Sequence, residues 1–159
     1  MSKAIMVIGT LDTKGDEVRY VKEQIEARGH ETIVVDVGVL DEPPLQADLT
    51  RQEVANAGGL SLPEVLASGD RRIAVQTMMD GAIKIAKELH RTGKLSGVVG
   101  VGGGTGTHIC TGVMRALPLG VPKLMVSTVA SRDMSQEIST KDITMMHSVI
   151  DMLLSLIHI

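Results

Sequence analysis

The chain of 159 residues is long enough for one domain with a sizeable core, and its 43% apolar and 22% charged residues are typical of globular proteins. A net charge of −3, with no long run of Lys or Arg, excludes the electrostatic footprint of a nucleic-acid-binding protein. The start of the chain holds too few consecutive apolar residues for a signal peptide or a membrane span. A single cysteine, Cys110, excludes an internal disulfide and fits a reducing compartment. We therefore expect a cytoplasmic protein with no membrane partner.

The first forty residues predict a strand, a helix and a second strand. Residues 4–10 are a short β-branched run, as expected of a strand that is buried on both faces. Apolar positions recur with helical spacing over residues 16–28, and Gly29 ends this helix. Residues 31–38 form a second apolar run. Such a βαβ unit places its two strands parallel, with a right-handed crossover.

Three helices are predicted next. Pro43 and Pro44 mark a loop, after which a short helix begins near Asp48 or Thr50 and stops at Gly58. A second short helix follows Ser61, its expected cap, with Pro63 in its first turn. The longest helical pattern covers residues 71–91.

The remaining elements complete an α/β alternation. Residues 95–103 predict a third strand, residues 107–118 a helix that ends at Pro118, and residues 122–130 a fourth strand. The alternation predicts a three-layer α/β domain with a mostly parallel, Rossmann-like open sheet. We expect the strand order 2-1-3-4, which places the topological switch point between the first and third strands.

Two loops at the carboxyl ends of these two strands are candidates for binding phosphate. The segments "GTLDTKG" (9–15) and "GVGGGTGT" (100–107) each lead into the N-terminus of a helix, where free N–H groups and the macrodipole favour an anion. Glycines let the backbone approach a phosphate closely, and threonines add hydroxyl donors. The candidate residues are Gly9, Thr10, Asp12, Thr13, Lys14, Gly102, Gly103, Gly104, Thr105, Gly106 and Thr107.

Neither loop matches a standard nucleotide fingerprint. A P-loop requires a Gly-Lys pair before Ser or Thr, which does not occur here. The pattern G-x-G-x-x-G fails because Thr105 or Thr107 stands where its last glycine would be. We therefore do not expect a conventional nicotinamide site on the third strand.

Other side chains have two interpretations each. Lys14 could neutralise a phosphate, and Asp12 could hold Mg²⁺ through water or cap the first helix. Asp36 could bind a ribose or serve as a turn residue at the end of its strand. Ser127 and Thr128 end the fourth strand beside the same crevice.

We predict no metal site made of protein side chains alone. His108 and Cys110 are two apart on a helix and point in different directions, so they do not form a metal pair. For Cys110 we favour a place in the core over a nucleophilic role, because the sequence offers no base beside it.

Several strings in order along the chain resemble one known family. The strings "GTLDTKG", "VVDVGV", "GVVGVGGGTGT", "MRALPLGVPKLMVSTVAS" and "TKDITMM" are similar to the start of the ATP-binding domain family typified by a tomato-mosaic-virus resistance protein of plants, which has many uncharacterised bacterial members. The resemblance implies a nucleotide bound between two α/β subdomains. The matching positions are Gly9–Lys14, Gly102–Thr107 and Ser127–Thr128.

The same resemblance sets our expectation for the domain organisation. Residues 1–151 would form the nucleotide-binding subdomain, and the second subdomain of the family would be absent. Residues 152–159 would be an apolar tail that is truncated or not native. A homo-oligomer, or the missing subdomain, would then cover the exposed apolar surface.

The leading hypothesis is an ATP-binding domain, with Mg²⁺, whose phosphates lie on the glycine-rich loops. One alternative is an enzyme that binds a small phosphorylated or carboxylated metabolite at the same loop. Another is a protein-interaction module gated by nucleotide, which the ten methionines favour. Whether the chain is an enzyme is left open, because no water-activating base is evident.

Overall fold

The computed structural model describes residues 3–148. The apolar tail predicted at residues 152–159 lies outside the described residues. Five parallel strands form one sheet in the order β2-β1-β3-β4-β5. The predicted α/β class and the order of the first four strands are confirmed. The strands are β1 Ala4–Gly9, β2 Glu31–Asp36, β3 Leu95–Gly102, β4 Lys123–Ser127 and β5 Thr144–His147.

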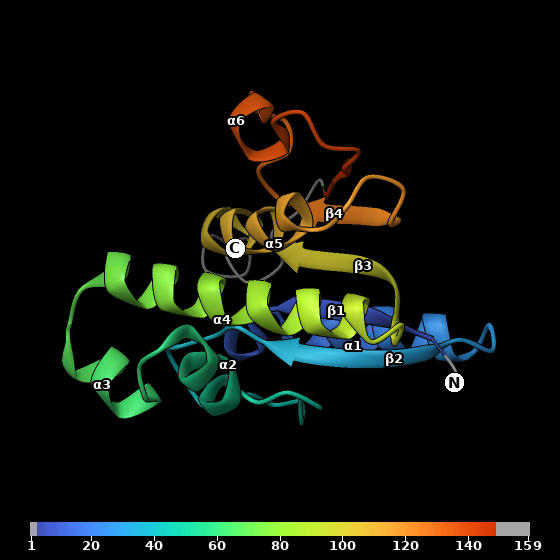
Figure 1. Cartoon of the computed structure of the whole chain (residues 1–159). Coiled ribbons are helices and arrows are strands. Elements are labelled where there is room, and N and C mark those ends of the chain that lie inside the picture. The colour runs from blue at the N-terminus through green and yellow to red at the C-terminus, as the bar shows by residue number, and fades with distance from the viewer. Residues whose placement is uncertain (1–2, 149–159) are drawn as a thin grey trace, which may run out of the picture.

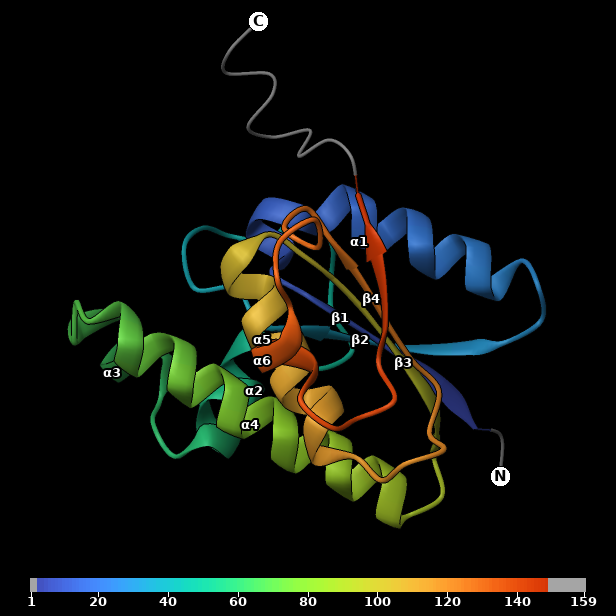
Figure 2. The same cartoon turned by 90° about the horizontal axis from the view of Figure 1, so that it is seen from above.

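Helices cover both faces of the sheet (Figures 1 and 2). Figure 2 shows α1 alone on one side of the strands, with α2, α4 and α5 on the other. The helices are α1 Leu11–Glu26, α2 Arg51–Gly58, α3 Leu62–Ala67, α4 Arg71–Arg91, α5 Gly104–Ala116 and α6 Ser135–Ile138.

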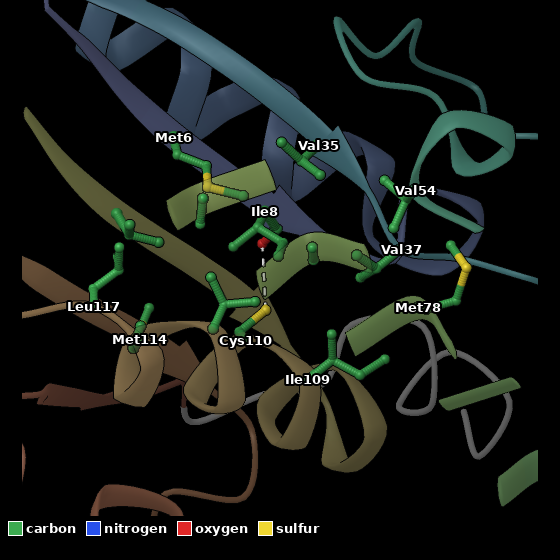
Figure 3. Packing of buried hydrophobic residues seen from close by; sticks show 14 of the residues in the cluster. Met6, Ile8, Val35, Val37, Val54, Met78, Ile109, Cys110, Met114 and Leu117 are labelled. Carbon is green, nitrogen blue, oxygen red and sulfur yellow. Dashed lines mark hydrogen bonds between the residues drawn. The ribbon is translucent and has the colours of Figure 1, made fainter. Parts of the chain in front are cut away.

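The alternation of side chains along β1 explains the two cores. Met6 and Ile8 point into the larger cluster beneath α4 and α5, whereas Val7 between them packs with Val18 of α1 in the smaller one. All four side chains are fully buried. In Figure 3, methionine and aliphatic side chains fill the larger core, which holds no aromatic ring because the described chain has only the exposed Tyr20. A strand that is apolar on both faces belongs in the middle of a three-layer domain.

The two short helices begin as their sequences predict. Thr50 and Glu53 form a reciprocal capping box at α2, and Ser61 and Glu64 form another at α3. Each box satisfies backbone N–H groups that have no partner within the helix. The caps thus determine where these helices start.

Close backbone contact joins α2 to α4. An added Cβ at Gly81 would lie 1.9 Å from the carbonyl oxygen of Val54, and one at Gly58 would lie 2.1 Å from that of Thr77. Only glycine permits this approach. The contact anchors the first half of α4, whose N-terminus reaches the carboxyl edge of the sheet (Figure 1).

Two helix starts differ from the prediction, and two short elements were not predicted. Helix α1 begins at Leu11 instead of residue 16, because the carboxylate of Asp36 accepts the N–H of Leu11 at 3.1 Å and so holds the first turn, and the helix kinks at Lys14. Helix α5 begins at Gly104, three residues before its predicted start. The short elements α6 and β5 were not predicted, because residues 131–148 contain no long periodic apolar run.

Candidate functional site

The carboxyl ends of β1 and β3 lie side by side, as the predicted switch point requires. Gly9 pairs with Val101 in the parallel register, so the loops that follow both strands start at the same height. A Cβ at Gly106 would come within 3.9 Å of the hydroxyl of Thr10. The two glycine-bearing loops therefore form one surface, where open α/β sheets bind their ligands.

A cavity of about 740 Å³ opens at this surface. Its polar residues come from the starts of α1, α4 and α5, and its apolar wall comes from the segment after β2 and from α3, α4 and α5. The polar lining is Thr10, Asp12, Thr13, Lys14, Asp70, Arg71, Gly103, Gly104, Thr105 and Gly106. The apolar lining includes Val37, Val39, Leu40, Val65, Leu66, Ala74, Val75, Met78 and Ile109.

Among the described residues, no side chain caps the N-terminus of α5, because its N-cap is Gly103. An added Cβ at Gly104 would meet nothing within 4 Å, so the space above this residue is open. Gly102 is different, since a Cβ there would lie 2.8 Å from the backbone of Gly106. Gly102 thus allows the tight turn, and Gly104 exposes the uncapped amide end of the helix to the cavity.

The start of α1 contributes a second set of polar groups. The hydroxyls of Thr10 and Thr13 are 2.8 Å apart. Asp12 accepts the N–H of Leu40 on Oδ2 at 2.8 Å, while its Oδ1 is buried and has no hydrogen-bond partner among the described residues. Lys14 is only 5% exposed, and its ammonium lies 3.6 Å from the carboxylate of Glu17. Asp12 therefore fixes the loop after β2 with one oxygen and keeps the other for a further partner.

Asp36 joins the loop after β1 to the segment after β2. Its Oδ1 accepts the N–H groups of Leu11 at 3.1 Å and Gly38 at 2.8 Å, and the residue is 1% exposed. Burial raises the pKa of this carboxyl above its ordinary value, while the hydrogen bonds from the two backbone N–H groups lower it. Asp36 is outside the cavity lining and has the geometry of a strand-end residue that organises the site.

Thr107, Ser127 and Thr128 also lie behind the lining. The hydroxyls of Thr107 and Ser127 are 2.6 Å apart and buried, and Ser127 Oγ accepts the N–H of Val129 at 3.1 Å. The N–H of Thr128 donates to the carbonyl of Gly102 at 3.2 Å. These bonds join the end of β4 to the loop between β3 and α5. Gly9 and Gly102 also lie outside the cavity lining, where neighbouring atoms leave no space for a side chain.

Sequence reasoning missed Arg71. Its guanidinium donates to the hydroxyl of Thr105, so it connects the start of α4 to the start of α5 across 34 residues of sequence. A cation in the first turn of a helix is unfavourable to the helix dipole. Arg71 shares this unfavourable placement with Arg72, so the sequence alone does not single out Arg71.

Cys110 belongs to the core, as predicted. Its thiol is fully buried and donates to the carbonyl of Ile8 at 3.6 Å, the dashed line in Figure 3. Burial raises the pKa of the thiol to about 12, so it stays protonated at neutral pH and is not a nucleophile. His108, in contrast, is exposed.

Within residues 3–148, no group of three or more His, Cys, Asp or Glu side chains is arranged to hold a metal ion. No helix in the same range combines the length and apolar character that crossing a bilayer requires.

The fold and the cavity define a three-layer, Rossmann-like α/β domain with a polar crevice at the carboxyl edge of its sheet. The chain belongs to the family described as "Uncharacterised protein family (UPF0261) N-terminal domain", whose model matches residues 3–155. Family membership and the resemblance seen in the sequence thus agree.

Several relatives are similar over nearly the whole chain. A UPF0261 protein of Clostridium tetani is 46% identical over 151 residues, which cover 95% of this chain, and one of Rhizobium meliloti is 43% identical over 150 residues, or 94% of it. The ToMV resistance protein Tm-1(GCR237) of Solanum lycopersicum is 30% identical over 165 aligned positions and 94% of this chain. The chain spans 37% of the length of the two bacterial relatives and 22% of the tomato protein.

Proposed function

We propose that the chain is an ATP-binding domain whose ligand occupies the 740 Å³ cavity, with its phosphates on the amide groups at the start of α5 and beside the polar side chains at the start of α1. One observation carries the proposal: two helix N-termini meet at a single cavity, and Gly104 leaves open space in front of one of them. Oriented backbone amides at helix N-termini are a recurrent phosphate-binding device.

The remainder of the lining fits a nucleotide better than a free anion. Side chains of α3, α4 and the segment after β2 form an apolar wall, against which a base and a ribose can pack. Lys14 and Arg71 add positive charge near the amides, and Thr10, Thr13 and Thr105 add hydroxyls. A cavity with phosphate-binding groups on one side and an apolar wall on the other matches the chemistry of a nucleotide.

Asp12 fits a magnesium ion carried by the nucleotide. Mg²⁺ in nucleotide sites is commonly held by one or two carboxylates, by water and by the phosphates themselves. Asp12 lines the cavity, and its buried Oδ1 lacks a hydrogen-bond partner among the described residues. Bound Mg²⁺ would neutralise phosphate charge, and Asp12 would hold it directly or through water.

Calorimetric titration of the whole chain with ATP and Mg²⁺ tests the proposal. We expect saturable binding, which Gly104→Asp abolishes, because a carboxylate would then stand in the open space and repel phosphate. Thr140→Asp, at an exposed residue outside the cavity, is the matched control and should bind as the unaltered chain does. The full-length Clostridium tetani relative is titrated in parallel, since the chain spans 37% of its length. Absence of ATP binding in both proteins would refute the proposal.

The small-metabolite alternative makes a different prediction at the same cavity. Sugar phosphates or carboxylates would then raise the melting temperature while ATP, ADP and AMP would not. A thermal-shift screen with both ligand classes separates the two functions.

The proposed ATP-binding domain would lie in the cytoplasm, where ATP is available. We also expect it to self-associate along the edge of the sheet. β5 pairs only with β4 among the described strands, and Met146 on it is 53% exposed. An open strand edge with apolar residues favours pairing with a second copy. Sedimentation velocity should show a dimer, and a monomer at all concentrations would contradict this part of the proposal.

A further inference from the structure

Arg71 is a cation at the rim of the cavity whose only described hydrogen-bond partner is neutral. Its guanidinium donates to the hydroxyl of Thr105, and within residues 3–148 it forms no ion pair with a carboxylate. The adjacent Asp70 is engaged elsewhere, because it accepts the N–H of Arg72 at 2.8 Å and pairs with the Arg72 guanidinium at 3.0 Å. The positive charge of Arg71 is therefore available to an anionic ligand.

Two features of the position favour a phosphate as that ligand. Thr105 lies in the first turn of α5, so the guanidinium already stands at the uncapped amide end of the helix. Arg71 itself lies in the first turn of α4, where the helix dipole disfavours a cation and an added anion relieves the repulsion. Arginine also donates several N–H groups to one phosphate, and these charge-assisted hydrogen bonds are stronger than a hydrogen bond to a hydroxyl.

The two cations of the cavity differ in depth and in partners. Lys14 is 5% exposed and lies near the carboxylate of Glu17, whereas Arg71 is exposed. In the proposed site, a phosphate chain that runs from a nucleoside on the apolar wall toward solvent would have its inner phosphates near the buried Lys14 and its outermost phosphate near the exposed Arg71.

We propose that Arg71 is a specificity-determining residue that exchanges the hydroxyl of Thr105 for the outermost phosphate and so distinguishes nucleoside triphosphates from diphosphates. The inference rests on the proposed nucleotide site and names the ligand class that this site selects. The exchange adds a charge-assisted hydrogen bond that only the longer phosphate chain can reach.

Calorimetric titration of the whole chain with ATP and with ADP, both with Mg²⁺, tests Arg71→Gln. Loss of a hydrogen bond to a charged group should weaken ATP binding about tenfold or more and ADP binding less than about threefold. Arg71→Lys should restore part of the loss for ATP, because it keeps the charge and loses the guanidinium geometry. Arg72→Gln removes the same charge one residue further along and outside the cavity lining, so it should leave the ratio of the two affinities unchanged.

The outcomes separate this inference from the function on which it rests. If neither the unaltered chain nor the full-length Clostridium tetani relative binds ATP or ADP, the proposed function fails. If the unaltered chain binds both and Arg71→Gln weakens them equally, or weakens neither, the nucleotide site stands and the role of Arg71 is refuted. An equal change in the affinity ratio for Arg72→Gln would also refute it, because the effect would then come from general charge. Circular dichroism of each variant establishes that the fold is retained.

Discussion

At the scale of single residues, the glycines after β3 have two different roles. Gly102 is required by the fold, because any side chain there would meet the backbone of Gly106. Gly104 has no such steric reason, since a Cβ would enter empty space and the residue lies in the first turn of a helix. Under the proposed function, Gly104 would let a ligand approach the backbone at that point.

Alanine substitutions should therefore separate the two glycines. Gly104→Ala should leave the free energy of unfolding unchanged or raise it by up to about 1 kcal/mol, because alanine restricts the unfolded chain. The same substitution should weaken ATP binding roughly tenfold, since the methyl group occupies ligand space. Gly102→Ala should lower the free energy of unfolding by about 1–3 kcal/mol through overpacking.

Urea unfolding and calorimetric titration measure the two effects. A destabilised Gly104→Ala protein would mean that this glycine has a structural role. Unchanged ATP affinity of a stable Gly104→Ala protein would mean that the ligand does not pass above it.

At the scale of elements, one ion pair between a buried lysine and an exposed aspartate joins β4 to the segment before β5. Lys123, the first residue of β4, has a fully buried side chain that donates to the carbonyls of Pro118 and Val121 and, at 2.7 Å, to the carboxylate of Asp142. The other oxygen of Asp142 accepts the N–H of Gly120 at 2.7 Å. The pair therefore positions the segment that leads into β5, a strand of only four residues.

The pH dependence of folding should report this pair. The hydrogen bond from Lys123, followed by that from Gly120, lowers the pKa of Asp142 from 3.8 to about 2. A carboxyl whose pKa is lower in the folded state stabilises the fold above its unfolded-state pKa and loses that contribution as the pH falls toward the folded-state value. The contribution of Asp142 should thus be present above its ordinary pKa of 3.8 and be lost as the pH falls through about 2.

Urea unfolding across this pH range compares the unaltered chain with Asp142→Asn. The variant should be less stable at neutral pH, and the difference should shrink between pH 4 and pH 2. Asp41→Asn, at an exposed carboxylate, serves as the control. A constant difference at all pH values would show that the pair contributes through something other than the charge of Asp142.

At the scale of the whole molecule, the sequence predicts the parts of the fold that have continuous local patterns. The first four strands and the helices between them have unbroken apolar runs or helical periodicity, so their types and the 2-1-3-4 order are confirmed. β5 was missed because four residues carry too little periodicity, and its place depends on β4 and on the Lys123–Asp142 pair. The early start of α1 was missed because it depends on Asp36, 25 residues away.

The site was predictable to a similar extent. Glycine-bearing loops at strand ends can be recognised locally, and the cavity brings together Thr10, Asp12, Thr13, Lys14 and the 103–106 segment. Arg71 and the apolar wall come from α3, α4 and the segment after β2, which only the tertiary structure brings to the loops. Ser127 and Thr128 satisfied the sequence criterion of lying at a strand end, yet they bond to the back of the loop.

The proposed function requires that the phosphates of a nucleotide bind the uncapped backbone N–H groups at the start of α5. A crystal structure of the whole chain with Mg²⁺ and a non-hydrolysable ATP analogue tests this claim most directly. We predict electron density for the phosphates within hydrogen-bond distance of the backbone N–H groups of residues 104–106, with the nucleoside on the wall that Val75 and Met78 help to form. Phosphate density elsewhere, with the amides of residues 104–106 unoccupied, would contradict it.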